Sequence, residues 1–192
     1  MRRLTIILFF YSLNLFAADY TIDKSHTKVL FNITHLVFNT MTGKFDNFKG
    51  TFKYDEKKNI LSDVDVSIVT NSINTDNEKR DTHLRSEEFF FAEKYPEITF
   101  KFDNKKVNIG KQVNISGDLT MRGVTKKVDL KLTLNGPVTD PWGNSVLIFK
   151  LKGNVDRKDF GITWNKDLAG KVKGQLIGDV AEIDIQGEAN PK

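Results

Sequence analysis

Side chains that can carry acid and base chemistry concentrate in one segment, SINTDNEKRDTHLRSEEFF, which runs from Ser72 to Phe90. Arg80, Asp81 and His83 lie close together in it, among further charged residues. Nucleophilic catalysis would need an activated serine or a comparable group, yet the sequence has no GxSxG motif and no serine at a recognisable spacing from His83. The segment therefore gives little support for a catalytic centre, and we expect no enzyme activity.

The three histidines, His26, His35 and His83, include no pair four residues apart. Such a pair is what places two zinc ligands on one face of a helix in the zinc proteases. We therefore predict no metal site, although a site assembled across strands stays open at this point. His35 falls in register with apolar neighbours, so its ring could bond to backbone or contact a ligand head group.

A packing role accounts better for the charged segment. Arg80 and Asp81 can fix a loop by ion pairing, and Leu84 together with the rings of Phe89 and Phe90 can fold that loop back onto apolar surface. We therefore predict short helical segments that cap one end of a β structure.

The elements that must position this cap are strands. Val128, Leu130, Leu132 and Leu134 alternate strictly with polar residues, so one face points to a dry interior and the other to water. Comparable alternation recurs along the chain at Val29, Phe31, Ile33 and His35, at Val64, Val66 and Ile68, at Ile98, Phe100 and Phe102, at Leu147, Phe149 and Leu151, and at Ile183 and Ile185.

These runs are separated by turn residues at hairpin spacing, including a turn that we expect at Arg122 and Gly123. About eight strands follow, which predicts an all-β fold, an antiparallel barrel or sandwich, in one domain. An outer-membrane barrel would need its apolar face outward. The polar face here carries Lys127, Lys131 and Lys150, and a midplane lysine facing lipid costs about 2–4 kcal/mol. The sequence therefore disfavours an outer-membrane barrel.

Residues 1–17 have a charged start, an apolar run and a small residue at the end, the layout of a secretory signal peptide. We therefore predict residues 1–17 as signal peptide, residues 18–192 as the mature domain, and the periplasm as its location; a retained anchor is the alternative. The formal charge is +4 and includes Arg2 and Arg3, and the lysines form no patch interleaved with aromatics, so we expect no nucleic acid partner. The sequence has no cysteine, which excludes disulfides and thiol chemistry.

The chain resembles the YceI-like family over about residues 20–189. The resemblance rests on the order of three motifs: Ser72–Phe90, GDLTMRGVTKKV at Gly117–Val128 and DRKDFGITWN at Asp156–Asn165. The resemblance implies a lipocalin-like barrel in an exported domain that binds a polyisoprenoid or related lipid inside. It also implies that the charged segment borders the ligand cavity, and it transfers no catalytic residue.

The predicted ligand is a polyisoprenoid, an isoprenoid quinone or a similar amphiphile, held without any cofactor, in a periplasmic carrier. Transient membrane contact is left open. A homodimer is left open. The predicted apolar lining consists of Val29, Phe31, Ile33, Phe45, Val66, Ile68, Phe100, Leu119, Leu130, Leu132 and Phe149. The predicted polar residues near the mouth are His35, Arg80, Asp81 and His83.

Two other hypotheses stay open from the residues alone. The 15 phenylalanines could fill the barrel solidly, which would suit a structural or stress-response module with a protein partner. A lipid-directed enzyme is the third. Trp142 and Trp164 both lie near turns, and we expect each to be a packing anchor.

Overall fold

The computed structural model describes residues 17–170 and 172–192, so nearly all of the predicted signal peptide lies outside the described residues. None of the helices described there combines the length and the apolar character of a membrane span. The elements are β1 (Ala18–His35), β2 (Asn39–Phe45), β3 (Phe48–Asp55), β4 (Ile60–Val69), η1 (Thr70–Ser72), β5 (Ile73–Asn74), α1 (Glu78–Arg85), β6 (Glu97–Lys106), β7 (Gln112–Met121), β8 (Val124–Thr139), β9 (Ser145–Asp156), η2 (Arg157–Phe160) and β10 (Ile177–Pro191).

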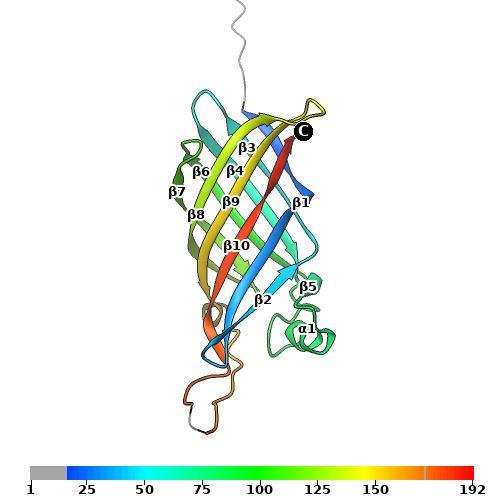
Figure 1. Cartoon of the computed structure of the whole chain (residues 1–192), viewed down its shortest axis with the longest axis vertical. Helices are drawn as coiled ribbons and strands as arrows, with labels where there is room; N and C mark the ends of the chain where they lie inside the picture. The colour runs from blue at the N-terminus through cyan, green and yellow to red at the C-terminus, as the bar shows by residue number, and fades with distance from the viewer. Residues whose placement is uncertain (1–16, 171) are drawn as a thin grey trace, which may run out of the picture.

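The strands form one antiparallel sheet that closes into a barrel (Figure 1). Closure comes from β1 and β10, which pair from Tyr20 and Pro191 to His35 and Ile177. β1 is long enough to pair with β3 near its start and with β2 near its end, so β2 and β3 together occupy one position in the barrel. The prediction of an eight-stranded antiparallel barrel with little helix is therefore confirmed.

One end of the barrel, which we call the closed end, is filled with side chains. It carries the C-terminus and the β3–β4 and β8–β9 connections (Figure 1). The rings of Tyr20 and Phe52 stack there with centroids 5.4 Å apart, and burial raises the pKa of Tyr20 and of Tyr54. The buried core of this end comprises Tyr20, Phe52, Tyr54, Leu61, Phe100, Phe102, Val107, Ile115, Leu130, Leu132, Leu134, Leu147, Phe149 and Ala189.

The other end, which we call the open end, holds a second core and the short helical elements. α1 and β5 lie beside it, and the connection from η2 to β10 extends beyond the strands (Figure 1). Its buried residues are Val29, Phe45, Phe48, Ile73, Phe89, Ile98, Met121, Val155, Phe160 and Ile162. The two cores share strands: β1, β3, β6, β7 and β9 each contribute buried residues to both ends.

The β7–β8 turn connects the open end to the cap. Arg122 and Gly123 both have positive φ, 52° and 73°, as a two-residue hairpin requires, so the predicted turn is confirmed. The Arg122 guanidinium donates to the carbonyl oxygens of Glu87, at 2.8 Å, and of Phe89. The cap is thereby held against a hairpin that is distant in sequence.

Asn77 caps the N-terminus of α1: its side chain accepts a hydrogen bond from the backbone N–H of Arg80 and so satisfies one free amide of the first turn. This is a predicted short helical segment, and its placement beside the open end agrees with the predicted cap. The helix brings Arg80 and His83 to the barrel interior, where the candidate site lies.

Candidate functional site

A cavity of about 390 Å³ occupies the open end of the barrel. Its lining is dominated by aliphatic and aromatic side chains from most of the barrel strands, with a few polar groups among them. The volume falls within the usual range of about 300–1,000 Å³ for small-molecule sites. His83 lines the cavity and still leaves 39 % of its side chain exposed, so the cavity reaches solvent beside the cap.

Most of the residues predicted from sequence border this cavity. They are Val29, Phe31, Ile33, His35, Phe45, Val66, Ile68, Arg80, His83, Phe100, Leu119, Leu130 and Phe149. Their position is a property of the fold, and their contact with a ligand remains a prediction. Leu132 and Asp81 do not border the cavity.

Leu132 faces inward as predicted, but it lies in the packed core of the closed end and is 5 % exposed. Along β8 the same inward face passes from the cavity at Val128 to the solid core at Leu132 and Leu134, and Leu130 between them belongs to both. Alternation identifies the face of a strand and not the height along the barrel axis. The prediction for Leu132 was therefore wrong.

Asp81 is 4 % exposed and turns away from the cavity. Its carboxylate accepts hydrogen bonds from the backbone N–H, at 2.9 Å, and the hydroxyl of Thr75. A buried carboxylate needs such donors, because an unpartnered charge is costly away from water. Asp81 therefore fixes the β5–α1 connection, by hydrogen bonds to Thr75 and not by the predicted ion pair with Arg80.

Arg80 sits on the cavity lining and is oriented through Thr75. Its Nε donates to Thr75 Oγ1 at 2.7 Å, and Nη2 donates to the Thr75 carbonyl oxygen at 2.6 Å. Among the described residues the guanidinium has no carboxylate within ion-pair distance. Since a guanidinium has five N–H donors, this side chain keeps capacity for a polar or anionic group at the rim.

An aromatic cluster forms the wall beside Arg80. The His83 ring packs edge-on against Phe89 and Trp164, with centroids 4.9 Å and 5.1 Å away, and His83 Nε2 donates to the Glu88 carboxylate at 2.6 Å. Trp164 borders the cavity and agrees with its expected role as an anchor. Trp142 is 85 % exposed, so the same expectation was wrong for that residue.

Phe31 and Phe45 line the cavity on the β1–β2 strand pair. Phe31 packs over Gly43, its partner across the strand pair, so closely that a Cβ at Gly43 would overlap the ring. Phe45 contacts Phe31 on one side and Phe90 on the other, with centroids 5.7 Å and 5.9 Å apart. Gly43 thereby keeps the large Phe31 side chain against the wall and leaves the interior empty.

Arg157 also borders the cavity, but its donors are occupied. It is 6 % exposed, and its guanidinium donates to the carbonyl oxygens of Gly178, Ile162 and Trp164, at 2.7–2.9 Å. Burial lowers its pKa, and Asp179 opposes that shift. Arg157 therefore fixes the chain that carries Trp164, a role that Arg80 does not share.

Several cavity residues were not on the predicted lining. They include Phe48, Val155, Ile162, Trp164, Ile177, Ala181, Ile183 and Ile185. The signal that could have identified some of them was present in the sequence: Ile183 and Ile185 are spaced two residues apart, and so are Ile162 and Trp164, as residues on one face of an extended chain are.

The described residues include one group with metal-ligating atoms close together, Asp23, His26 and Glu188. It lies away from the cavity, where β1 leaves its regular pairing with β10. A hydrogen bond from His26 at 2.9 Å helps to lower the pKa of Asp23, behind a larger effect of Ser25, and the Asp23 carboxylate raises the pKa of His26. These contacts explain the grouping as an ion pair on the surface.

An antiparallel barrel of eight strands with an apolar cavity at one end is a lipocalin-like architecture. The solved structure of BcnA from Burkholderia cenocepacia superposes with a TM-score of 0.74 at 19 % identity, covering 88 % of this chain and 99 % of that one. A Campylobacter jejuni YCEI protein superposes with a TM-score of 0.68 at 29 % identity, covering 83 % and 90 %. A polyisoprenoid-binding domain from Saccharophagus degradans gives 0.65 at 16 % identity, covering 92 % and 99 %.

The family model of the YceI-like domain matches residues 20–189. Protein YceI of Salmonella newport (strain SL254) is 44 % identical over 149 residues, which are 77 % of this chain and 78 % of that protein. The chain therefore belongs to the YceI-like family, and the resemblance drawn from the three motifs is confirmed.

Proposed function

We propose that the protein binds one amphiphilic lipid, with the apolar chain in the cavity of the open end and the head group beside Arg80 and His83. The apolar cavity is the observation that carries this proposal. Bound water needs two to four polar partners, and an apolar cavity of this kind offers few. Apolar ligand atoms can occupy such a space at little cost.

The energetics favour a chain over a compact polar molecule. Burying about ten methylene groups contributes roughly 8 kcal/mol before association costs, at about 0.8 kcal/mol for each group. Several kcal/mol of that gain are offset, because the ligand loses translational and rotational freedom and its chain becomes ordered. The remainder supports useful affinity without any specific hydrogen bond to the chain.

A polyisoprenoid or an isoprenoid quinone is the ligand class that we propose. The Saccharophagus degradans domain of similar fold is named for binding polyisoprenoid, and family membership supports the same class here. The donors of Arg80 suit a head group with oxygen acceptors. With the signal-like residues 1–17, this supports a carrier in the periplasm.

Binding accounts for the site better than catalysis. The Thr75 hydroxyl beside the cavity is engaged by both Asp81 and Arg80, and Nε2 of His83 is engaged by Glu88. Neither pair presents a nucleophile with an adjacent free base, which covalent lipid chemistry would need.

Two neighbouring residues of β10 give a matched test. Ala181 borders the cavity, whereas Val180 faces outward and is 45 % exposed. Ala181→Trp should fill cavity space and lower the affinity for geranylgeraniol at least tenfold, because the bulky ring occupies the site of the chain. Val180→Trp should leave that affinity unchanged.

Retention of radiolabelled geranylgeraniol during gel filtration measures the uptake, and urea unfolding of both variants establishes that each is folded. Equal uptake by the two folded variants would contradict the proposed binding site.

A further inference from the structure

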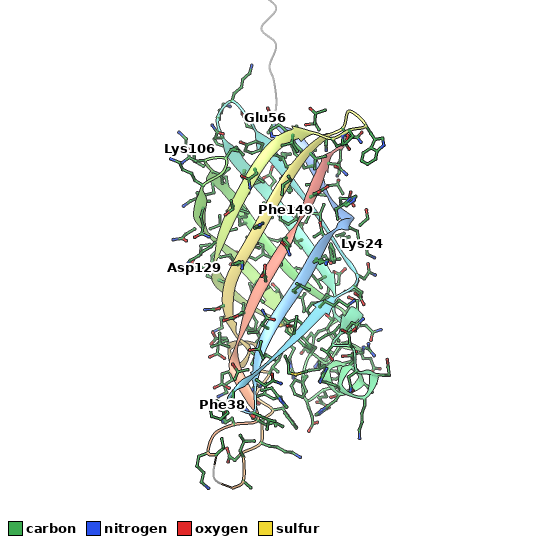
Figure 2. The ribbon with its side chains drawn as sticks, in the orientation of Figure 1. Lys24, Phe38, Glu56, Lys106, Asp129 and Phe149 are labelled. Atoms are coloured by element: carbon green, nitrogen blue, oxygen red, sulfur yellow. The ribbon has the colours of Figure 1, made fainter. Side chains whose placement is uncertain are left out.

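An exposed apolar surface lies beyond the cavity at the far tip of the open end. It consists of Leu36, Val37 and Phe38 in the β1–β2 turn and Val172 in the connection to β10, and we call it the tip. Phe38 is 81 % exposed. Figure 2 shows it at the opposite end of the molecule from Glu56 and Lys106.

The two segments of the tip form one surface. Leu36 donates its backbone N–H to the carbonyl oxygen of Leu176 at 2.8 Å. Gly174 lies so close to Val37 that a Cβ there would come within 2.7 Å of a Val37 methyl group. His35, which precedes Leu36 in the sequence, borders the cavity, and so does Leu176. The tip is therefore continuous with the cavity rim.

The backbone of the tip is held in an unfavourable conformation. Leu36 and Val37 have φ of 53° and 70°, a region that bulky and β-branched residues rarely adopt. A turn that only connected two strands would be more stable with glycine or asparagine at these positions. The sequence instead places three large apolar residues where they contact solvent, which points to a function for their exposure.

Positive charge flanks this apolar surface. Lys166 and Lys173 are exposed in the connection that leads to β10, as is Asp167. Neither lysine forms an ion pair within the described part of the chain. Lys166 lies 5.8 Å from the centroid of the Trp164 ring, which itself borders the cavity.

We propose that the tip docks on the surface of an anionic phospholipid bilayer. Exposed apolar residues flanked by lysines match such a surface, since the apolar groups enter the boundary with the acyl chains and the lysines meet the lipid phosphates. Docking there turns the cavity rim toward the bilayer. The proposal rests on residues outside the cavity, so it does not depend on the proposed function.

The closed end offers a competing surface with exposed Ile109, Val138 and Trp142. The Trp142 turn is an ordinary one, in which the Asp140 carboxylate accepts from the backbone N–H groups of Trp142 and Asn144, at 2.8 Å each. The turn carries the carboxylate of Asp140, but Ile109 lies between the exposed Lys106 and Lys111, so this end is not uniformly negative. The cavity does not extend to it. We expect the bilayer to prefer the tip because its exposed apolar residues are grouped in one turn that is continuous with the cavity rim.

The orientation can be measured because the sequence has no cysteine. Full-length Phe38→Cys and Trp142→Cys are each labelled with an environment-sensitive fluorophore and mixed with vesicles of phosphatidylcholine that contain phosphatidylglycerol. We expect a blue shift at residue 38 that exceeds any shift at residue 142. No shift at residue 38, or an equal or larger shift at residue 142, would overturn the proposal.

The charge contribution is tested in the Phe38→Cys background. Replacing Lys166 and Lys173 by glutamine should weaken vesicle binding about fivefold for each lysine, as expected for about 1 kcal/mol per cation near an anionic surface. Unchanged binding would overturn the assignment to anionic lipid. No cargo is added in either experiment, so a negative result would leave the proposed lipid binding standing.

Discussion

The closed and open ends of this barrel are built from the same strands, yet one is packed solid and the other is hollow. On β9, Leu147 is fully buried in the closed-end core, while Leu151 borders the cavity on the same inward face. On β8 the same change occurs between Leu132 and Val128, with Leu130 at the boundary in both sets. The comparison shows that a cavity needs no special residue composition. It forms where the inward side chains do not fill the barrel interior.

Ring orientation accounts for part of this difference. In the closed end, Tyr20 and Phe52 stack with an angle of 7° between their planes within the packed core. In the open end, Phe31 lies over Gly43 and leaves the centre free. The cap side chains of Phe89, Phe90 and Leu84 then close the side of the hollow end without filling it.

The largest effect should come from truncating the solid core. Leu147→Ala should lower the free energy of unfolding by about 2–5 kcal/mol, since it removes buried contacts and creates a new cavity. Leu151→Ala, four residues along the same strand, should cost only about 1–2 kcal/mol, because it enlarges a cavity that already exists. Urea unfolding of the lipid-free protein measures both values. A cost for Leu151→Ala equal to that for Leu147→Ala would show that the open end is as solid as the closed end.

A smaller effect, confined to the open end, should follow from Asp81→Ala. This change leaves the backbone N–H of Thr75 without its partner, a loss of about 1–3 kcal/mol for a buried donor. Hydrogen exchange should therefore become faster in β5 and α1 and stay unchanged in closed-end strands. Glu93→Ala, an exposed acidic change in the same cap segment, serves as the control. Faster exchange in both ends would mean that the cap and the barrel unfold as one unit.

The smallest effect concerns the bulge of β1 between the two ends. Asp23 raises the pKa of His26 above its usual 6.5, so the protonated form is stabilised by folding. The contribution of the protonated His26 to the free energy of unfolding is complete below the pKa of the unfolded state, and it is lost as the pH rises through the higher pKa of the folded state. The urea midpoint should therefore fall slightly as the pH rises above about 6.5, and His26→Gln should remove this component. An identical pH dependence in the variant would show that the pair contributes nothing measurable.

Much of this architecture could be predicted from the sequence. Period-two alternation identified the inward face of β8 and β9, and the Arg122–Gly123 dipeptide identified a hairpin. The depth of each residue could not be predicted, because it depends on strand tilt and on pairing between distant strands. Leu132 was misplaced for that reason.

The charged cap was harder to predict. Asp81 and Arg80 are adjacent in sequence, but the carboxylate reaches its partners away from the cavity while the guanidinium lies on the lining. Both form hydrogen bonds with Thr75, and nothing in the sequence marks Thr75 as their shared partner. Trp142 and Trp164 likewise lie near similar turns, and only the tertiary fold separates the exposed Trp142 ring from the partly buried Trp164 ring.

The most direct test of the account is the native mass of the protein purified without detergent, followed by solvent extraction and mass spectrometry of what is released. We expect the wild-type protein to carry one isoprenoid lipid per cavity and Ala181→Trp to carry none, with both proteins folded. A wild-type mass equal to that of the bare polypeptide, with an empty extract, would contradict the claim that the open end is a lipid site.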